Sequence, residues 1–271
     1  MSLVNELKTV DILISFIKNL AREAGGICLE GQKDLTSHDL EFKSAKDIVT
    51  EIDKQVESFL VKAILARYPD HGVLGEEYGA VQAKSAFRWI IDPIDGTTSF
   101  VHRLPFYSIS IALEKEGELV LGVVYAPAID QLFYAEKGKG AFVGDTPIHV
   151  SETRELGNAV MATGFACLRA GLEDNNLPIF NEIVPKLRDI RRFGSAALDL
   201  CYTALGSLDG FWEINLNIYD IAAGTVILRE AGGVVTDFTG GRQFPEKGFA
   251  ASNKGLHNEL IHILAGFCAS A

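Results

Sequence analysis

The chain has 271 residues, of which 48% are hydrophobic, and its formal net charge is −11. This composition supports a substantial core in one large domain or two small ones, and it excludes the disordered and collagen-like classes. The acidic balance disfavours direct binding to nucleic acid, which requires a basic face, although a few metal ions can still make one site attractive to an anion.

The longest apolar stretches, such as 120–128, have the length of a strand. They are far shorter than the roughly 20 residues of a membrane-spanning helix. The N-terminus lacks the basic-then-apolar pattern of a secretion signal, so we expect a cytoplasmic protein that does not enter a membrane. The wide spacing of the cysteines favours buried reduced thiols over disulfides or a zinc site. These cysteines are Cys28, Cys167, Cys201 and Cys268.

Two helices are predicted first along the chain. Apolar residues recur at helical spacing from Val10 to Ala21, and the pair Gly25-Gly26 is expected to end this helix as a C-cap. A second helix is predicted over about 51–67. Thr50 followed by Asp53 resembles a capping box at its start.

Strand signals dominate the next part of the chain. Residues 87–91 predict one strand, and 107–114, 118–127 and 131–138 predict strands of an antiparallel meander. Residues 1–150 therefore indicate an α+β half, in which two helices pack on an antiparallel sheet.

From residue 151 to 271 the rhythm changes to alternating strands and helices, which predicts an α/β half. The predicted strands are 159–165, 189–193, 209–214 and 233–238, and the predicted helices are 175–187, 195–205, 219–232 and 254–267. Without a repeat or a long linker, the two halves are expected to share an extensive interface.

The stretch "DPIDGTT" follows directly on the apolar strand at 87–91 and carries Asp92 and Asp95. Asp-Pro and Asp-Gly are ordinary turn dipeptides, so a plain turn is the simplest interpretation. However, an unpaired carboxylate at the end of a buried strand costs free energy, and residues 96–98 can begin a helix whose free N–H groups face an anion. Carboxylates beside such a site require cations between them, and oxygen ligands without His or Cys indicate Mg²⁺.

Other acids could complete such a site, although each signal is weak by itself. Glu76 and Glu77 lie in "VLGEEYG", where a solvated loop is the simpler interpretation. Asp47 precedes a short apolar stretch, and Asp220 lies at a predicted helix start, where the helix dipole alone would favour an acid. For Asp53 we favour helix capping.

Taken in order, four motifs resemble the inositol monophosphatase family of Mg²⁺-dependent, lithium-sensitive phosphatases over nearly the whole chain. They are "DIVTEID", "GEE", "DPIDGTTSFVHRLPFYSISIAL" and "YDIAAGTVILREAGG". The segments "RRFGSAALDLC" and "DGFWEI" resemble its bacterial-type branch. The resemblance implies a fold of the α+β or α/β class, a layered αβαβα sandwich of the sugar-phosphatase type, and a homodimer.

The resemblance also implies roles for individual residues. Two to three Mg²⁺ ions would be held by Glu76, Asp92, the carbonyl of Ile94, Asp95 and Asp220. Asp47 and Thr97 would be the catalytic pair that orients the attacking water. The N–H groups of Gly96 and Thr97 would receive the phosphate, and Ala196, Glu213 and Asp220 would contact the polyol. Trp212 is interpreted as a core residue, and Arg191 and Arg192 receive no assignment.

The implied reaction is hydrolysis of a small phosphorylated polyol or sugar, first of all myo-inositol 1-phosphate, by in-line attack of a metal-activated water without a phosphoenzyme. Fructose-1,6-bisphosphatase or dual activity is the close alternative. Glu213 favours a neutral polyol, because it would repel a second phosphate. A regulatory partner with a vestigial metal site is an alternative of a different class, against which the complete ligand set speaks.

Overall fold

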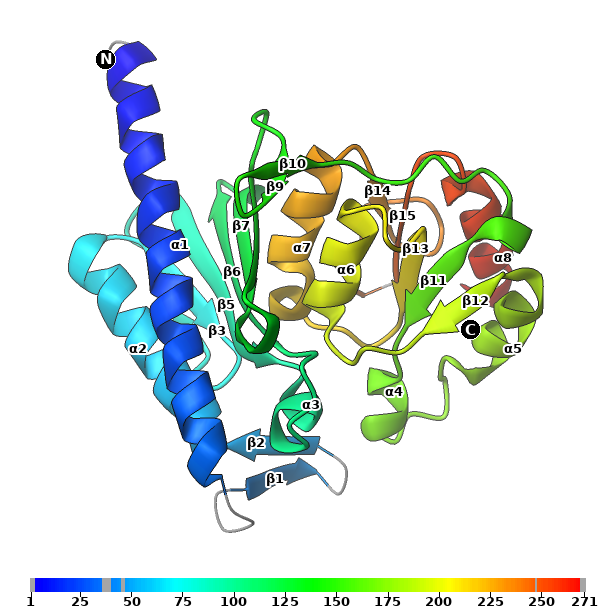
Figure 1. Cartoon of the computed structure of the whole chain (residues 1–271), viewed down its shortest axis with the longest axis horizontal. Helices are drawn as coiled ribbons and strands as arrows, with labels where there is room; N and C mark the ends of the chain where they lie inside the picture. Colours follow the sequence, from blue (N-terminus) through cyan, green and yellow to red (C-terminus); the bar gives the residue numbers. More distant parts are fainter. Residues whose placement is uncertain (1–2, 36–39, 45–46, 247, 269–271) are drawn as a thin grey trace.

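In the computed structural model, five layers of helices and strands alternate, which confirms the predicted αβαβα sandwich (Figure 1). The structure describes residues 3–35, 40–44, 47–246 and 248–268, with side chains described in these ranges except at residues 3–12, 40, 42–44, 47, 48 and 268. Three apolar cores fill the spaces between the layers. Among the described residues, no helix combines the length and the apolar character that crossing a bilayer would require.

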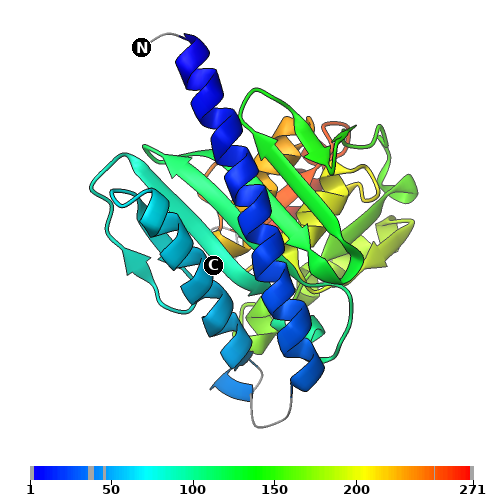
Figure 2. The same ribbon diagram turned by 60° about the vertical axis from the view of Figure 1, so that its left-hand side comes forward.

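Helices α1 (Leu3–Asp34) and α2 (Glu51–Arg67) lie side by side on the outer face of the first sheet (Figure 2). The bounds predicted for α2 and its capping box are confirmed. The predicted end of α1 at Gly25-Gly26 is wrong, since the helix continues to Asp34. A Cβ at Gly25 would lie only 2.5 Å from the ring of Tyr125, so this glycine lets the helix approach the sheet closely. Packing against the sheet thus offsets the roughly 1 kcal/mol helix penalty of Gly25.

The first sheet has eight strands in the order β10-β9-β8-β7-β6-β5-β3-β4. The predicted meander is confirmed, because β5 to β8 pair antiparallel in succession. The sheet is not wholly antiparallel, since β3 runs parallel to β5. Its strands are β3 (Gly72–Gly75), β4 (Ala80–Val81), β5 (Phe87–Asp95), β6 (Ser108–Lys115), β7 (Glu118–Ala126), β8 (Gln131–Glu136), β9 (Ala141–Val143) and β10 (Thr146–Ile148). A separate antiparallel hairpin is formed by β1 (Leu40–Ser44) and β2 (Asp47–Thr50).

Two helices from the C-terminal part of the chain, α6 (Ala196–Ala204) and α7 (Ile218–Glu230), form the middle layer. They confirm the helices predicted over 195–205 and 219–232. A Cβ at Gly122 of β7 would lie 2.4 Å from the carbonyl oxygen of Ala223, so α7 packs directly on the backbone of the first sheet. Because α6 and α7 share a core with that sheet, the division into halves 1–150 and 151–271 stays a proposal.

The second sheet has five strands in the order β12-β11-β13-β15-β14. They are β11 (Val160–Thr163), β12 (Asp189–Arg191), β13 (Gly210–Glu213), β14 (Val234–Thr236) and β15 (Phe249–Ser252), the last of which was not predicted. Its outer face is covered by α5 (Leu177–Ile183) and α8 (His257–Cys268). Short helices complete the chain: α3 (Thr97–Val101), α4 (Ala166–Arg169), and the 3₁₀ turns Pro127–Ile129, Leu156–Asn158 and Val184–Lys186.

Several smaller predictions can be compared with the second sheet and its surroundings. Pro185 divides the helix predicted over 175–187 into α5 and the 3₁₀ turn that follows it. Trp212 is fully buried and donates to the side-chain oxygen of Asn176, which confirms it as a core residue. Three of the cysteines are buried free thiols, as predicted, and the side chain of Cys268 lies outside the described residues.

Candidate active site

The candidate site begins where β5 loses its regular pairing with β6. Asp92 lies opposite Ser110 and Asp95 opposite Ser108, so one extra residue bulges out of β5 between the two acids. The bulge accommodates Pro93, which cannot donate a ladder hydrogen bond. The N–H of Ile94 donates to Oδ1 of Asp92 at 3.0 Å. As a result, both carboxylates are buried at the same end of the strand, with Asp92 1% and Asp95 8% exposed.

Helix α7 brings a third carboxylate to this point from more than a hundred residues away. Asp220 lies in its first turn, where its Oδ2 accepts from the N–H of Asn217 at 2.6 Å. One carboxylate oxygen each of Asp92, Asp95 and Asp220 lie within 4.8 Å of one another. Three buried or half-buried anions at this separation repel one another, and hard oxygen donors of this kind fit Mg²⁺ or a similar divalent cation. The residues present therefore fit the predicted metal.

Glu76 and the carbonyl of Ile94, the other predicted ligands, line the same cavity of about 480 Å³ as the three aspartates. Glu76 lies in the turn after β3, outside the close group of three. The carboxylate of Glu57, buried in α2, accepts from the N–H groups of Glu77 at 2.8 Å and Tyr78 at 2.9 Å. Helix α2 thus holds the turn that presents Glu76 to the cavity.

Burial and mutual repulsion disfavour the charged forms of these acids. Burial raises the pKa of Asp92 well above its usual range, and the nearby charges of Glu76 and Asp95 raise it further. The pKa of Asp220 is raised by burial and by Asp95. Burial raises the pKa of Asp95 to about 6, against the hydrogen bonds from Ser195 and the N–H of Ala197 that favour its charged form. The folded protein without cations therefore holds protons that the unfolded chain would release.

This difference predicts how pH and Mg²⁺ change stability. When folding raises the pKa of an acid, the folded state binds more protons than the unfolded state at any pH between the unfolded pKa and the folded pKa. The free energy of unfolding therefore falls as pH rises from the unfolded pKa to the folded pKa. With the folded pKa values of Asp95 near 6 and Asp53 near 7, we expect the metal-free melting temperature to fall from about pH 4 to about pH 7. Millimolar Mg²⁺ should raise the melting temperature by about 5 °C at neutral pH and by little at about pH 5.

Differential scanning fluorimetry in EDTA or Mg²⁺ measures the pH dependence and the shift caused by Mg²⁺, with matched monovalent salt as the control. The absence of a shift at neutral pH would contradict the metal site.

Thr97, predicted to be catalytic, lies at the first position of α3 with an acidic partner. Its hydroxyl lies 3.2 Å from Oδ1 of Asp53 and 3.2 Å from the carbonyl oxygen of Ile94. Asp53, which we had interpreted as a capping residue, does cap α2: its Oδ2 accepts from the N–H of Thr50 at 2.9 Å. The capping interpretation was therefore incomplete, because the two oxygens of Asp53 face different partners.

The partner predicted for Thr97 was Asp47, whose side chain lies outside the described residues. The backbone of Asp47 begins β2, six positions before Asp53. Among the described side chains, the acid beside Thr97 is Asp53, and the role predicted for Asp47 stays a prediction. Burial raises the pKa of Asp53 to about 7, which is a suitable value for a proton acceptor at neutral pH.

Gly96, predicted to receive the phosphate through its N–H, is the residue that precedes α3. Its φ of +95° lies in the left-handed region, which favours glycine. A Cβ here would lie 2.9 Å from the carbonyl oxygen of Phe106 and 3.1 Å from that of Gly194, so a side chain would also collide with two backbones. Gly96 and Thr97 both line the 480 Å³ cavity. Glycine at position 96 therefore lets the chain turn from β5 into α3 at the edge of the carboxylate group.

The predicted polyol contacts line a smaller chamber of about 40 Å³, which shares Asp95 and Asp220 with the larger cavity. Ala196 and Glu213 lie on its wall. Glu213 is 5% exposed and accepts from the N–H of Ala166 at 2.8 Å, and burial raises its pKa to about 7. The structure thus brings together every predicted site residue whose side chain it describes.

Three further residues of the site were not predicted. Arg169 and Arg192 line both cavities, and their charges lower the pKa of Glu213 against the effect of its burial. Ser195 donates to Oδ2 of Asp95 at 2.6 Å and accepts from the N–H of Leu198, so it joins the end of β5 to the start of α6. The pair "RR" at 191–192 was a visible signal without an assignment, whereas nothing local in the sequence marks Arg169.

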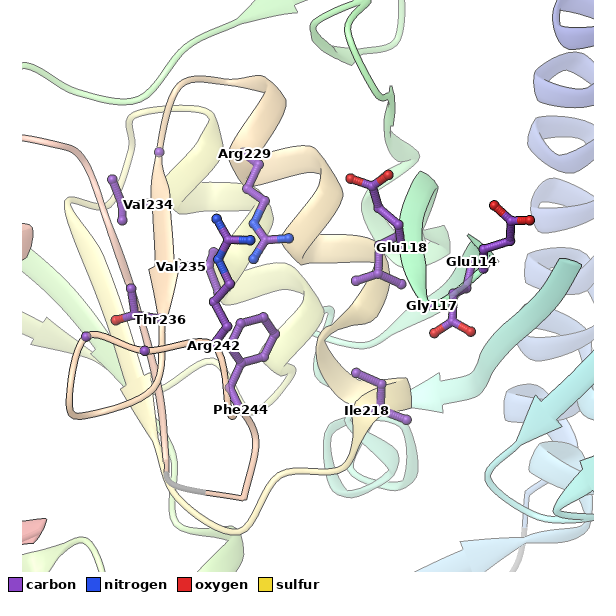
Figure 3. Close-up of a pocket in the computed structure, with 15 residues that line it drawn as sticks. Glu114, Gly117, Glu118, Ile218, Arg229, Val234, Val235, Thr236, Arg242 and Phe244 are labelled. Carbon is purple, nitrogen blue, oxygen red and sulfur yellow. The ribbon is translucent and has the colours of Figure 1, made fainter. Parts of the chain in front are cut away.

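A second cavity, of about 860 Å³, lies elsewhere, between the β6–β7 turn and the part of the chain formed by β14 and the segment after it (Figure 3). Arg229 and Arg242 lie on one side of it, and Glu114 and Glu118 lie on the other. Glu114 pairs with Arg88 and Glu118 with Lys137. This cavity contains none of the predicted site residues, and the described residues form only one close group of potential metal ligands, the three aspartates.

Comparison with known proteins agrees with this geometry. The model of the inositol monophosphatase family matches residues 10–267. The Nus factor SuhB of Pasteurella multocida is 42% identical over 229 residues, 84% of this chain and 86% of that protein. The inositol-1-monophosphatase of Mesorhizobium japonicum is 38% identical over 251 residues, 92% of this chain and 94% of that protein. The crystal structure of the extragenic suppressor protein suhB from Bartonella henselae superposes with a TM-score of 0.88 at 37% identity, covering 93% of this chain and 98% of that one.

Proposed function

The chain belongs to the inositol monophosphatase family, and on this premise we propose that it hydrolyses small phosphate monoesters, first of all myo-inositol 1-phosphate. The observation that carries the proposal is the convergence of Asp92, Asp95 and Asp220 within 4.8 Å beside the hydrogen-bonded pair Thr97–Asp53. Three carboxylates that repel one another at one point do not stabilise the fold, so their position there indicates a binding role.

Two to three Mg²⁺ ions would be held by Asp92, Asp95, Asp220, Glu76 and the carbonyl of Ile94. When bound, such cations lower the pKa of water and neutralise phosphoryl oxygens, which addresses the electrostatic barrier to hydrolysis of a phosphate dianion. The aspartates also fix where the phosphoryl group must lie, because it has to contact cations that all three can reach.

Thr97 and Asp53 would orient and deprotonate the attacking water. The Thr97 hydroxyl donates toward Asp53 or Ile94, which leaves its lone pairs to accept a hydrogen from the water. Asp53, with a pKa near 7, would take up the proton through Thr97. No side chain needs to form a covalent phosphoenzyme in this scheme. The N–H groups of Gly96 and Thr97 would bind the phosphate, and Ala196, Glu213 and Asp220 would contact the leaving polyol.

A fructose-1,6-bisphosphatase or dual activity is the second candidate, and one observation favours it. From the sequence alone, the negative charge of Glu213 was expected to repel a second phosphate. In the structure, Arg169 and Arg192 lie close enough to Glu213 to lower its pKa, and both also line the larger cavity. Two guanidinium groups could therefore receive a second phosphate, so Glu213 no longer excludes a bisphosphate substrate.

A regulatory role without catalysis is the alternative of a different class, since several relatives are named Nus factor SuhB. The group of three buried aspartates beside Thr97–Asp53 speaks against a purely vestigial site. A homodimer, sensitivity to Li⁺ and a cytoplasmic location stay predictions from the family resemblance.

One substrate panel tests these candidates. Purified protein is assayed for phosphate release from myo-inositol 1-phosphate, fructose 1,6-bisphosphate, 3′-phosphoadenosine 5′-phosphate and p-nitrophenyl phosphate, with Mg²⁺ and with added Li⁺. We expect the highest kcat/KM for the inositol ester, dependence on Mg²⁺ and inhibition by Li⁺. Comparable kcat/KM for the bisphosphate would favour the dual activity, and Mg²⁺-independent or absent hydrolysis of all four would overturn the proposed function.

A further inference from the structure

Asp199 is a buried acid near the site for which the fold provides no partner. It lies in the first turn of α6 and is 2% exposed. Its Oδ1 is buried and has no hydrogen-bond partner among the described residues. An unsatisfied polar group at this depth destabilises a protein, so it requires an explanation.

Helix capping does not supply that explanation. An acid in a first turn can be stabilised by the helix dipole or by the free N–H groups. In α6, however, the N–H of Leu198 already donates to Ser195 and the N–H of Ala197 to Asp95. Burial raises the pKa of Asp199 well above its usual range, and Glu213 raises it further, so the net effect of its surroundings is unfavourable to the charge.

Asp199 does face one open space, the 40 Å³ chamber whose other walls include Glu213, Arg192 and Asp220. Because one water-sized group needs about 10–15 Å³, this space holds only a few such groups. It shares Asp95, Arg169, Arg192, Gly194 and Asp220 with the 480 Å³ cavity, so it is an inner recess of the same site. A hydroxyl group entering from the cavity meets four carboxyl groups: Asp95 and Asp220 belong to the group of three aspartates, and Glu213 and Asp199 lie outside it.

We propose that Asp199 is a specificity-determining residue that, together with Glu213, binds a hydroxyl group of the substrate's polyol in this recess. The proposal rests on the proposed phosphatase function. A hydroxyl suits this recess because it can both donate to a carboxylate and accept from a protonated carboxyl or from Arg192. Substrates with adjacent hydroxyls on the leaving group would use the recess, and simple aryl phosphates would not.

The test compares Asp199→Asn with Asp209→Asn. Asp209 is a matched control: it is 7% exposed, and its two oxygens accept from Ser151 at 2.6 Å and from the N–H of Val160 at 2.7 Å, outside the candidate site. The measured quantity is the ratio of kcat/KM for myo-inositol 1-phosphate to that for p-nitrophenyl phosphate. For Asp199→Asn we expect this ratio to fall about ten-fold, near the upper end of the loss typical of one hydrogen bond, and mainly through KM. For Asp209→Asn the ratio should stay unchanged.

The melting temperature separates a specificity role of Asp199 from a structural role, because the two roles predict different shifts for Asp199→Asn. In EDTA without substrate, Asp199→Asn should keep or raise the melting temperature, because no hydrogen bond is lost, while Asp209→Asn should lower it. Protection of the wild type by free myo-inositol in the same assay should be lost in Asp199→Asn.

The outcomes separate the two proposals. If the wild type hydrolyses the inositol ester but Asp199→Asn lowers both kcat/KM values equally and lowers the melting temperature, Asp199 is structural and only the inference is overturned. If the wild type hydrolyses neither ester, the proposed function is overturned; protection by myo-inositol that depends on Asp199 would then still support the recess, and unchanged protection would overturn it too.

Discussion

Replacing Asp92 by Asn is expected to lower phosphatase kcat/KM by about a thousand-fold or more, even at saturating Mg²⁺. Asp92 is the most deeply buried of the three aspartates, and one of its oxygens lies within 4.8 Å of an oxygen of Asp95 on its own strand and of an oxygen of Asp220 on α7. An amide keeps the shape but removes the charge that binds a divalent cation, and it leaves two carboxylates that cannot hold the cations in the same positions. Phosphate release across a Mg²⁺ titration measures the effect.

The same substitution should have an opposite effect on the metal-free protein. Asn holds neither a buried charge nor a proton that the unfolded chain would release, so the melting temperature in EDTA at neutral pH should rise, and most of the stabilisation by Mg²⁺ should be lost. Glu114→Gln is the matched control, since it removes one carboxylate from the neighbouring strand β6, where Glu114 pairs with Arg88 at 2.9 Å. Near-normal turnover of Asp92→Asn at saturating Mg²⁺ would show that the metal assignment is wrong.

The second large effect is expected at Thr97. Thr97→Val keeps the shape of the side chain but removes the hydroxyl that lies 3.2 Å from Asp53. We expect kcat to fall about a hundred-fold, in the range typical of general acid–base groups, while the Mg²⁺ concentration for half-maximal rate changes less than about three-fold. Thr97→Ser retains the hydroxyl and should retain most of the activity. A parallel loss of kcat and Mg²⁺ affinity in Thr97→Val would instead indicate a metal ligand.

The acid behind Thr97 is identified by comparing Asp53→Asn with Asp47→Asn. With a folded pKa of Asp53 near 7, wild-type kcat should rise with pH up to about pH 7, because the base must lose its proton before it can accept one. Asp53→Asn should lose this limb and most of kcat. Thr50→Val is its stability control, since it disturbs the same capping box without touching Thr97. If Asp47→Asn alone removed the limb, the pair proposed from the sequence would be restored.

Local patterns were sufficient for most of the secondary structure. The bounds of α2 and its capping box depend on residues within a few positions of one another, and so do the turns of the meander β6–β8. The error at Gly25-Gly26 has a tertiary cause. Glycine is a common helix terminator, but here it is required because Tyr125 of β7 packs against that turn of α1.

The interpretation of Asp53 shows a different limit. A capping box is a complete explanation of an acid at the third position of a helix, so sequence reasoning had no reason to look further. Only the position of α3 beside the start of α2 reveals that the second oxygen of Asp53 contacts Thr97. A residue with two acceptor atoms can satisfy a local rule and serve the site at the same time.

By itself, the sequence determined most helices and strands, which follow from short-range periodicity. It also carried the family motifs, and the resemblance of these motifs implied the layered fold and nominated the carboxylates and Thr97. Only the tertiary structure decided that Asp53 contacts Thr97, that Arg169 and Arg192 lie beside Glu213, and that Asp199 faces the inner recess. The physical reason is that these relations join elements that lie far apart in the chain, whose distances depend on how α6, α7 and the two sheets pack rather than on any local preference.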